Sequence, residues 1–404
     1  MLVLTVFLLA LAVCAYAKPI LGPGDRMVFL GDSITEQRIH TRYVMNYFAL
    51  RYPGVDISFR NAGWGGDTAP GGLNRLQRDV LDLKPTVVSI CFGMNDAGYK
   101  AFDKAAFEKY MTGMTGLVAG LKKAGVKVVL LTPGCVHGEK VRAFFAVETM
   151  KAYNDTLALF AKGVEDLAAR EKLPVYDIHA LMLDVQTKAI AADPSFTMIP
   201  DAVHPSPAGQ AVMAYGLLKA LGCDEEPSGL KIDAATSNVE ADRCKVSGLK
   251  IAPDSVSFTR TDAALPTYFD PEASATFAYF PIVQELNNYP FSVTGLKAGN
   301  WKLTVQGIEV GVFSAADLAK GVNLATLPGP WRTLGEKVNQ LSREQEDLYF
   351  TRWRQISLVN LPKGAAPERR ALLNKMDKLV SAKERARMDA TAKRDWQWGL
   401  VLVP

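Results

Sequence analysis

The sequence has few residues of the kinds that several protein classes require. Of its 404 residues, only five are cysteines and four are histidines. The histidines are His40, His137, His179 and His204, and none has the spacing of a zinc-ligand pair. The net charge of +4 is small, whereas a dedicated nucleic-acid-binding protein usually carries a dense basic surface. The composition therefore argues against a zinc enzyme and against nucleic acid as a partner, and we expect no metal or other cofactor.

Long apolar runs are absent beyond residue 17, so we expect no stable membrane insertion of the mature protein. Residues 1–17 are apolar and end in Ala15-Tyr16-Ala17, a pattern that precedes a signal-peptide cleavage site, although basic residues are missing after Met1. We expect residues 1–17 to be a signal peptide and the protein to be exported to the periplasm or the cell exterior. Leu11-Ala-Val-Cys14 offers lipoprotein anchoring as an alternative, which the valine before the cysteine disfavours.

Removal of such a signal leaves four cysteines, which allow three pairings. They are Cys91, Cys135, Cys223 and Cys244. Cys91 lies in an apolar strand pattern, which is typical of a small buried thiol. Cys223 and Cys244 bracket a polar segment and could form a disulfide in an oxidising compartment. The sequence leaves this pairing open.

From Asp25 to Gly222, apolar segments of strand length alternate with helical patterns. The predicted strands are Met27–Leu30, Val55–Arg60, Thr86–Phe92, Val126–Leu131 and Pro174–Asp177. The predicted helices are Glu36–Leu50, Gly72–Leu83, Phe107–Ala124, Thr149–Glu171 and Pro207–Leu221. This alternation predicts an α/β domain with a parallel sheet covered by helices on both faces. Ligands bind such sheets at the carboxyl ends of the strands, so the following loops are where chemistry is expected.

Two of these loops can present polar groups to a ligand. Gly31-Asp-Ser-Ile-Thr35 follows the first strand and places Ser33 near a helix N-terminus, where backbone N–H groups favour negative charge. Asn61-Ala-Gly-Trp-Gly-Gly-Asp-Thr68 follows the second strand, and its three glycines let backbone N–H groups approach a ligand closely. Each motif alone is also compatible with an ordinary turn.

Two further segments complete a possible site. Gly93-Met-Asn-Asp96 follows the third strand and offers the Asn95 amide as a donor. Asp201-Ala-Val-His204 precedes the last predicted helix and brings a carboxylate close enough to orient the imidazole.

Together these residues supply the parts of serine esterase chemistry. Ser33 is expected to attack an acyl carbon, His204 to take its proton and return it to the leaving alcohol, and Asp201 to orient the imidazole. The N–H groups of Ser33 and Gly66 and the amide of Asn95 are expected to stabilise the oxyanion.

The same segments resemble the motifs of the SGNH subgroup of GDSL-type esterases and lipases. The matching positions are Ser33 as the nucleophile, Gly66 and Asn95 in the oxyanion hole, and Asp201 and His204 in the closing Asp-x-x-His. Ile34 stands where the first motif usually has leucine. The resemblance covers roughly half of the chain. It implies a flavodoxin-like three-layer α/β/α fold and metal-free ester hydrolysis, without a Gly-x-Ser-x-Gly elbow around the serine.

The composition becomes polar and rich in turn formers at Cys223–Gly229. Short alternating runs from Ile232 to Phe313 then predict antiparallel β structure, such as a small sandwich. Leu334–Leu361 and Pro367–Lys393 read as helices. The expected organisation is a signal peptide at 1–17, an SGNH hydrolase domain at 18–224, a β-rich accessory module at 225–325 and a helical C-terminal region at 326–404.

Aromatic residues in the helical C-terminal region allow two interpretations. Tyr349, Trp353, Trp396 and Trp398 either belong to a solvated helix pair or form a lid over the substrate. The sequence does not separate these interpretations.

The favoured function is an exported serine ester hydrolase that removes small acyl groups, above all acetyl from carbohydrate. A lysophospholipase or thioesterase acting on lipid acyl esters is the alternative substrate class. A noncatalytic carbohydrate-binding protein that retains the fold is the alternative of another class. The expected partner is thus a small acyl ester or an acetylated carbohydrate.

Overall fold

A computed structural model describes residues 19–137 and 147–404 of the chain. The expected signal peptide and Cys14 lie outside these residues. Within the described ranges, no helix combines the length and the apolar character needed to cross a membrane.

The first part of the chain is built on one parallel sheet. Its strands are β1 (Arg26–Gly31), β2 (Ser58–Gly63), β3 (Val87–Cys91), β4 (Lys127–Leu131) and β5 (Val175–Tyr176). The strand order is β2-β1-β3-β4-β5, and all pairs are parallel. Met27–Leu30 is fully buried, as expected for a central strand with helices on both faces. The predicted α/β class with a parallel sheet is confirmed.

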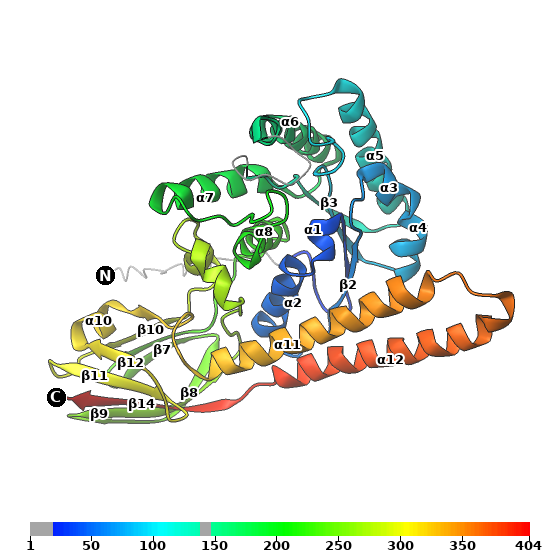
Figure 1. Cartoon of the computed structure of the whole chain (residues 1–404). Coiled ribbons are helices and arrows are strands. Elements are labelled where there is room, and N and C mark those ends of the chain that lie inside the picture. The colour runs from blue at the N-terminus through cyan, green and yellow to red at the C-terminus, as the bar shows by residue number, and fades with distance from the viewer. Residues whose placement is uncertain (1–18, 138–146) are drawn as a thin grey trace, which may run out of the picture.

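Helices cover both faces of this sheet (Figure 1). They are α1 (Ser33–Glu36), α2 (His40–Arg51), α3 (Ala69–Asn74), α4 (Leu76–Asp79), a 3₁₀ turn at Leu81–Leu83, α5 (Lys104–Lys123), α6 (Val147–Glu171), α7 (Ile178–Ala192) and α8 (Pro207–Ala220). In the sheet, β2 lies on one side of β1, whereas β3, β4 and β5 follow one another on its other side. Right-handed crossovers therefore put α2 on one face and α5 and α6 on the other, and α8 packs beside α2.

The β-rich part contains two sheets that share a hydrophobic core. Its strands are β6 (Gly229–Asp233), β7 (Asn238–Asp242), β8 (Cys244–Ala252), β9 (Ser255–Asp262), β10 (Pro290–Thr294), β11 (Asn300–Val305), β12 (Ile308–Ser314), β13 (Val322–Asn323) and β14 (Asp395–Val403). The orders are β13-β10-β6-β7 and β12-β11-β14-β9-β8. Pairing is antiparallel except between β6 and β10, which departs from the all-antiparallel expectation. Short helices lie at Pro271–Thr276, Ile282–Glu285 (α9) and Ala315–Lys320 (α10).

The C-terminal region forms a helical hairpin that runs along the α/β domain (Figure 1). It consists of α11 (Pro330–Phe350), a π-helical segment at Thr351–Ser357, a 3₁₀ turn at Lys363–Ala365 and α12 (Ala366–Ala390). After α12, the chain returns to the accessory module as β14, so the last part of the predicted helical region is a strand. There Trp396 and Trp398 are buried in the accessory core, and the hypothesis that they cover the substrate is wrong.

The four described cysteines are free thiols, so the disulfide considered between Cys223 and Cys244 is absent from the structure. Cys223 is buried in the core of the α/β domain, whereas the Cys244 thiol donates to the carbonyl of Gly229 at 3.2 Å. Burial raises the pKa of the Cys223 thiol above its ordinary value, which keeps this thiol protonated and unreactive.

Candidate active site

Ser33 is the first residue of α1, directly beyond the carboxyl end of β1. The turn between strand and helix is tight, because a Cβ added at Gly31 would lie 2.7 Å from the carbonyl oxygen of Cys91. Asp32 caps the helix, and its side chain accepts from the backbone N–H of Ile34 at 2.9 Å. This cap gives Asp32 a structural role in the turn, and burial raises its pKa to about 7. Ser33 itself remains partly exposed.

His204 and Asp201 reach Ser33 from the loop before α8. Ser33 Oγ lies 2.8 Å from Nε2 of His204, and Nδ1 of the same ring lies 2.8 Å from Oδ2 of Asp201. The other Asp201 oxygen accepts from the backbone N–H groups of Val203 at 3.1 Å and His204 at 2.7 Å. The structure therefore joins the three predicted residues in one hydrogen-bonded chain.

The Asp201 carboxylate is electrostatically suited to orienting a histidine. Partial burial alone would raise its pKa, but the hydrogen bonds from the His204 ring and from two backbone N–H groups outweigh this effect. They hold the pKa of Asp201 well below its ordinary value. A carboxylate that stays charged favours the tautomer with a proton on Nδ1, which leaves Nε2 of His204 to accept from Ser33.

Gly66 lies in a tight turn that follows β2. The Asp67 N–H donates to the carbonyl of Trp64 at 3.0 Å and closes a four-residue turn over residues 64–67. Gly66 is the third residue of this turn and has a φ of +73°, which a residue with a side chain rarely adopts. We call residues 64–67 the oxyanion turn. Its exposed glycines can present a backbone N–H to a ligand, as the sequence suggested.

Asn95 is tied to the oxyanion turn. Its Nδ2 donates to the carbonyl of Asp67 at 2.9 Å, and its Oδ1 accepts from the Tyr99 hydroxyl at 3.0 Å. These two contacts identify Nδ2 as the donor and Oδ1 as the acceptor of the Asn95 amide. The Nδ2 group carries a second hydrogen, which it can donate to a ligand. The neighbouring strands β1, β2 and β3 lead to Ser33, Gly66 and Asn95, respectively. The last residues of these strands are aligned in the sheet, at Gly31, Gly63 and Cys91.

Two charged residues that the sequence analysis did not single out hold these loops. Buried Arg75 donates to Asp67 Oδ2 at 2.7 Å and to the carbonyls of Ala62 at 2.8 Å and Gly31 at 3.2 Å. It thereby connects the ends of β1 and β2 to the oxyanion turn.

Asp96 holds the third loop, because it accepts from the backbone N–H groups of Ala69 at 2.8 Å and Gly93 at 3.0 Å. Burial raises the pKa of Asp96 to about 7. In the sequence, only the position of Asp96 next to Asn95 indicates that it belongs to this site.

The comparisons with known proteins agree with this geometry. Residues 29–212 match the model of the GDSL-like lipase/acylhydrolase family. The chain thus contains a GDSL-like lipase/acylhydrolase domain. It is therefore a carboxylic ester hydrolase, and the predicted resemblance to SGNH hydrolases is confirmed.

Two curated relatives each match about half of this hydrolase. An acetylxylan esterase of Geobacillus stearothermophilus is 24% identical over 224 residues, which make up 50% of this chain and 96% of that protein. An isoamyl acetate-hydrolyzing esterase of Saccharomyces cerevisiae is 23% identical over 210 residues, 49% of this chain and 86% of that protein.

A solved structure extends the similarity of fold to the whole hydrolase. It is described as a gut microbial diltiazem-metabolizing enzyme and has a TM-score of 0.83 at 24% identity. The match covers 96% of this chain and 99% of that one, so the accessory module and the helical hairpin are part of a shared fold.

The other three histidines of the hydrolase are engaged elsewhere. His40 Nδ1 lies 2.6 Å from Oε1 of Gln210, and His179 Nδ1 lies 3.1 Å from the carbonyl of Gly134. His137 Nδ1 lies 2.7 Å from the hydroxyl of Thr197. In the part of the chain that the structure describes, no three His, Cys, Asp or Glu side chains are grouped so as to hold a metal ion.

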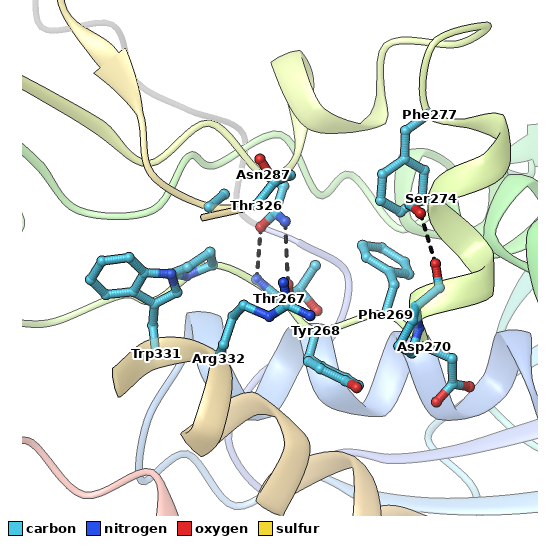
Figure 2. A pocket seen from close by; sticks show the side chains of 13 residues that line it. Thr267, Tyr268, Phe269, Asp270, Ser274, Phe277, Asn287, Thr326, Trp331 and Arg332 are labelled. Carbon is cyan, nitrogen blue, oxygen red and sulfur yellow. Dashed lines mark hydrogen bonds between the residues drawn. The ribbon is translucent and has the colours of Figure 1, made fainter. Parts of the chain in front are cut away.

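A separate cavity of about 340 Å³ lies where the accessory module meets the start of α11 (Figure 2). Tyr268, Phe269 and Trp331 are among its lining residues, and none of the five candidate site residues is. Figure 2 shows the paired hydrogen bonds between Thr267 and Asn287 that brace its wall. We interpret this cavity as part of the junction between modules, distinct from the candidate active site.

Proposed function

We propose that this hydrolase removes small acyl groups, above all acetyl, from carbohydrate. Ser33 acts as nucleophile, His204 as general base and acid, and Asp201 as the residue that orients the histidine. The hydrogen-bonded chain of these three side chains is the observation that carries the proposal. We further propose that the protein is exported, on the basis of the apolar segment at 1–17.

Acylation begins when Ser33 Oγ attacks the acyl carbon of the ester. As the new C–O bond forms, the hydroxyl proton passes to Nε2 of His204, and the carbonyl oxygen becomes an oxyanion. Collapse of the tetrahedral intermediate breaks the bond to the alcohol, which leaves with the proton from His204. The product of this half-reaction is an acyl group on Ser33.

Deacylation uses the same groups with water as the nucleophile. His204 takes a proton from the water as its oxygen attacks the acyl carbon, and then returns the proton to Ser33 Oγ as the acid is released. In both halves the imidazolium is next to the charged Asp201 carboxylate, which stabilises it.

The oxyanion is stabilised by the N–H groups of Ser33 and Gly66 and by the amide of Asn95. Each such donor typically lowers the barrier by about 2.7–4 kcal/mol. The hydrogen bond between Asn95 and the carbonyl of Asp67 supports this proposal, since it ties one donor to the turn that carries another.

Two relatives support a small acyl group. One is described as an acetylxylan esterase and the other as an isoamyl acetate-hydrolyzing esterase, so both names refer to acetyl esters of different alcohols. The first name, together with an accessory β-rich module, favours carbohydrate as the alcohol.

A substrate series tests this proposal. We expect kcat/KM to be highest for p-nitrophenyl acetate and to fall steadily through butyrate and octanoate to palmitate. Acetylated xylo-oligosaccharides should release acetate, whereas lysophospholipids should release no fatty acid. The matched control is Ser33→Ala prepared in the same way. A maximum at long chains, or fatty acid release that exceeds acetate release, would replace carbohydrate with lipid as the substrate class.

A further inference from the structure

Arg354 connects the C-terminal hairpin to the candidate active site. It lies in the π-helical segment that follows α11, where this end of the hairpin reaches α4 (Figure 1). Its Nη1 donates to Oε1 of Glu36 at 2.6 Å, and its guanidinium lies 3.6 Å from the centre of the Trp64 ring. These partners are 318 and 290 residues away in the sequence, so only the fold brings them together.

The Arg354 side chain is enclosed by aromatic rings. The ring centres of Trp353 and Phe350 lie 5.3 and 5.5 Å from its guanidinium. The side chains of Arg354 and Glu36 are only 21% and 23% exposed. An ion pair with this degree of burial and a stacked ring is screened less by water than a surface pair.

The neighbouring Trp353 is fixed as well. Its Nε1 donates to Asp79 Oδ1 in α4 at 3.0 Å, and its ring meets that of Trp64 edge to face at 5.8 Å. The π-helical segment is therefore anchored on the hydrolase domain at two adjacent residues. Single π-helical turns occur frequently at functional sites.

The partners of Arg354 lie in the two segments that carry the proposed oxyanion donors Ser33 and Gly66. Glu36 ends α1, the short helix that begins with Ser33, and Trp64 begins the oxyanion turn that contains Gly66. Glu36 also lies against this turn, because a Cβ added at Gly65 would be 2.8 Å from Oε2 of Glu36.

We propose that Arg354 is a positioning residue that clamps α1 to the oxyanion turn, and that the C-terminal hairpin thereby completes the active site. This proposal rests on the function proposed above. Arg75 holds the oxyanion turn at Asp67, and Arg354 holds it at Trp64. The two glycines between these points are exposed, and glycine restricts the backbone less than other residues do. We therefore infer that both ends must be fixed to keep the Gly66 N–H at a constant distance from the Ser33 N–H.

The consequence of losing this clamp should be specific to the transition state. Oxyanion donors bind the charge that develops during attack more strongly than they bind the ground-state ester. A displaced donor therefore lowers kcat and leaves KM almost unchanged. Displacement by about 1 Å can lower the rate by about 100-fold, so we expect a 10- to 100-fold loss.

The test compares Arg354→Gln with Arg352→Gln. Arg352 lies in the same π-helical segment but pairs with Asp377 of α12 at 2.6 Å, away from the oxyanion turn. We expect Arg354→Gln to lose kcat on p-nitrophenyl acetate, Arg354→Lys to recover part of it, and Arg352→Gln to match the parent protein. Amide hydrogen exchange in a peptide spanning residues 64–67 should accelerate in Arg354→Gln only.

A double variant tests whether Arg354 acts through Glu36. If Arg354 acts through Glu36, the double variant Glu36→Gln/Arg354→Gln should be no slower than Arg354→Gln alone. Parental kcat together with parental exchange in Arg354→Gln would overturn the proposal. An equal fall in kcat for Arg352→Gln would also overturn it, since the effect would then be one of hairpin stability. Activity retained by Ser33→Ala would instead contradict the proposed function, and the exchange experiment would still report on the clamp.

Discussion

Ser33 depends on neighbours that keep its hydroxyl and its helix in place. His204 is presented by a loop in which Ala202 has a φ of +73°, an unfavourable conformation for a residue with a side chain. The hydrogen bonds from this loop to Asp201 compensate, because they use the carboxylate oxygen that does not face the ring. The loop therefore tolerates the backbone strain at Ala202, in a conformation that aligns the carboxylate, the imidazole and the hydroxyl.

Replacing Asp201 with asparagine tests whether the carboxylate acts through the histidine. An amide could still accept the backbone N–H bonds, but it would no longer stabilise the imidazolium or select the tautomer. We expect kcat to fall by about 10³- to 10⁴-fold with little change in the melting temperature. The control is Asp193→Asn, because Asp193 is an exposed carboxylate that accepts from Ser195 in a nearby loop. A variant Asp201→Asn within tenfold of the parent protein would remove Asp201 from this role.

The five candidate site residues could be predicted from the sequence, but the residues that hold them in place could not. Ser33, Gly66, Asn95, Asp201 and His204 occur in short motifs that can be read locally. Arg75 and Arg354 are ordinary arginines in the sequence, and their partners are fixed only by tertiary structure. The roles of the five predicted residues remain predictions.

The interface between α2 and α11 contains a buried acid. Glu346 is 5% exposed, and its Oε1 accepts from the Thr41 hydroxyl at 2.7 Å. Its Oε2 has no hydrogen-bond partner among the residues that the structure describes. Burial raises the pKa of Glu346 to about 7. A protonated carboxyl is therefore the form that suits this interface in mildly acidic solution.

This buried acid predicts a pH dependence of folding stability. Because the folded-state pKa of Glu346 lies above the ordinary value, the unfolded chain loses the proton first as pH rises. The contribution of Glu346 to stability is complete below the ordinary pKa and is lost as pH rises to about 7. Glu346→Gln removes this ionisation, so its free energy of unfolding relative to the parent protein should rise by about 2–3 kcal/mol between pH 4 and pH 8.

Urea unfolding at the two pH values measures this difference. Glu336→Gln, an exposed change on the same helix, is the control and should leave the pH dependence of the parent protein unchanged. If the free energies of unfolding of the parent protein and of Glu346→Gln changed in parallel with pH, the pKa of Glu346 would not be raised in the folded protein.

Helix boundaries were harder to predict than the existence of the sheet. The predicted helix Glu36–Leu50 corresponds to α2, which begins only at His40. Glu36 ends α1 instead, and Arg38 adopts a φ of +59° between the two helices. Helix α7 was not predicted, although Asp177 caps it through a hydrogen bond to the N–H of Ala180. Its apolar residues are spread around the helix, so the sequence lacks a clear amphipathic period there.

The modules of this hydrolase are interdependent. Leu50 of α2 is buried in the accessory core, and its carbonyl accepts from the N–H of Leu265 at 2.9 Å. The hairpin crosses the hydrolase domain before β14 returns to the accessory sheet, where Trp398 stacks on Phe258 at 5.7 Å. Such contacts between distant segments carry no local sequence signal, so the sequence alone indicates three separate parts. The domain limits given there remain predictions.

The central claim, that Ser33 is the nucleophile, is tested most directly by covalent labelling of the whole chain. Diethyl p-nitrophenyl phosphate should transfer one diethylphosphoryl group to the protein, and peptide mass spectrometry should locate it on Ser33. Loss of esterase activity should follow the extent of labelling, and His204→Ala should react far more slowly. Complete inactivation with Ser33 unmodified, or full activity with Ser33 phosphorylated, would contradict the account.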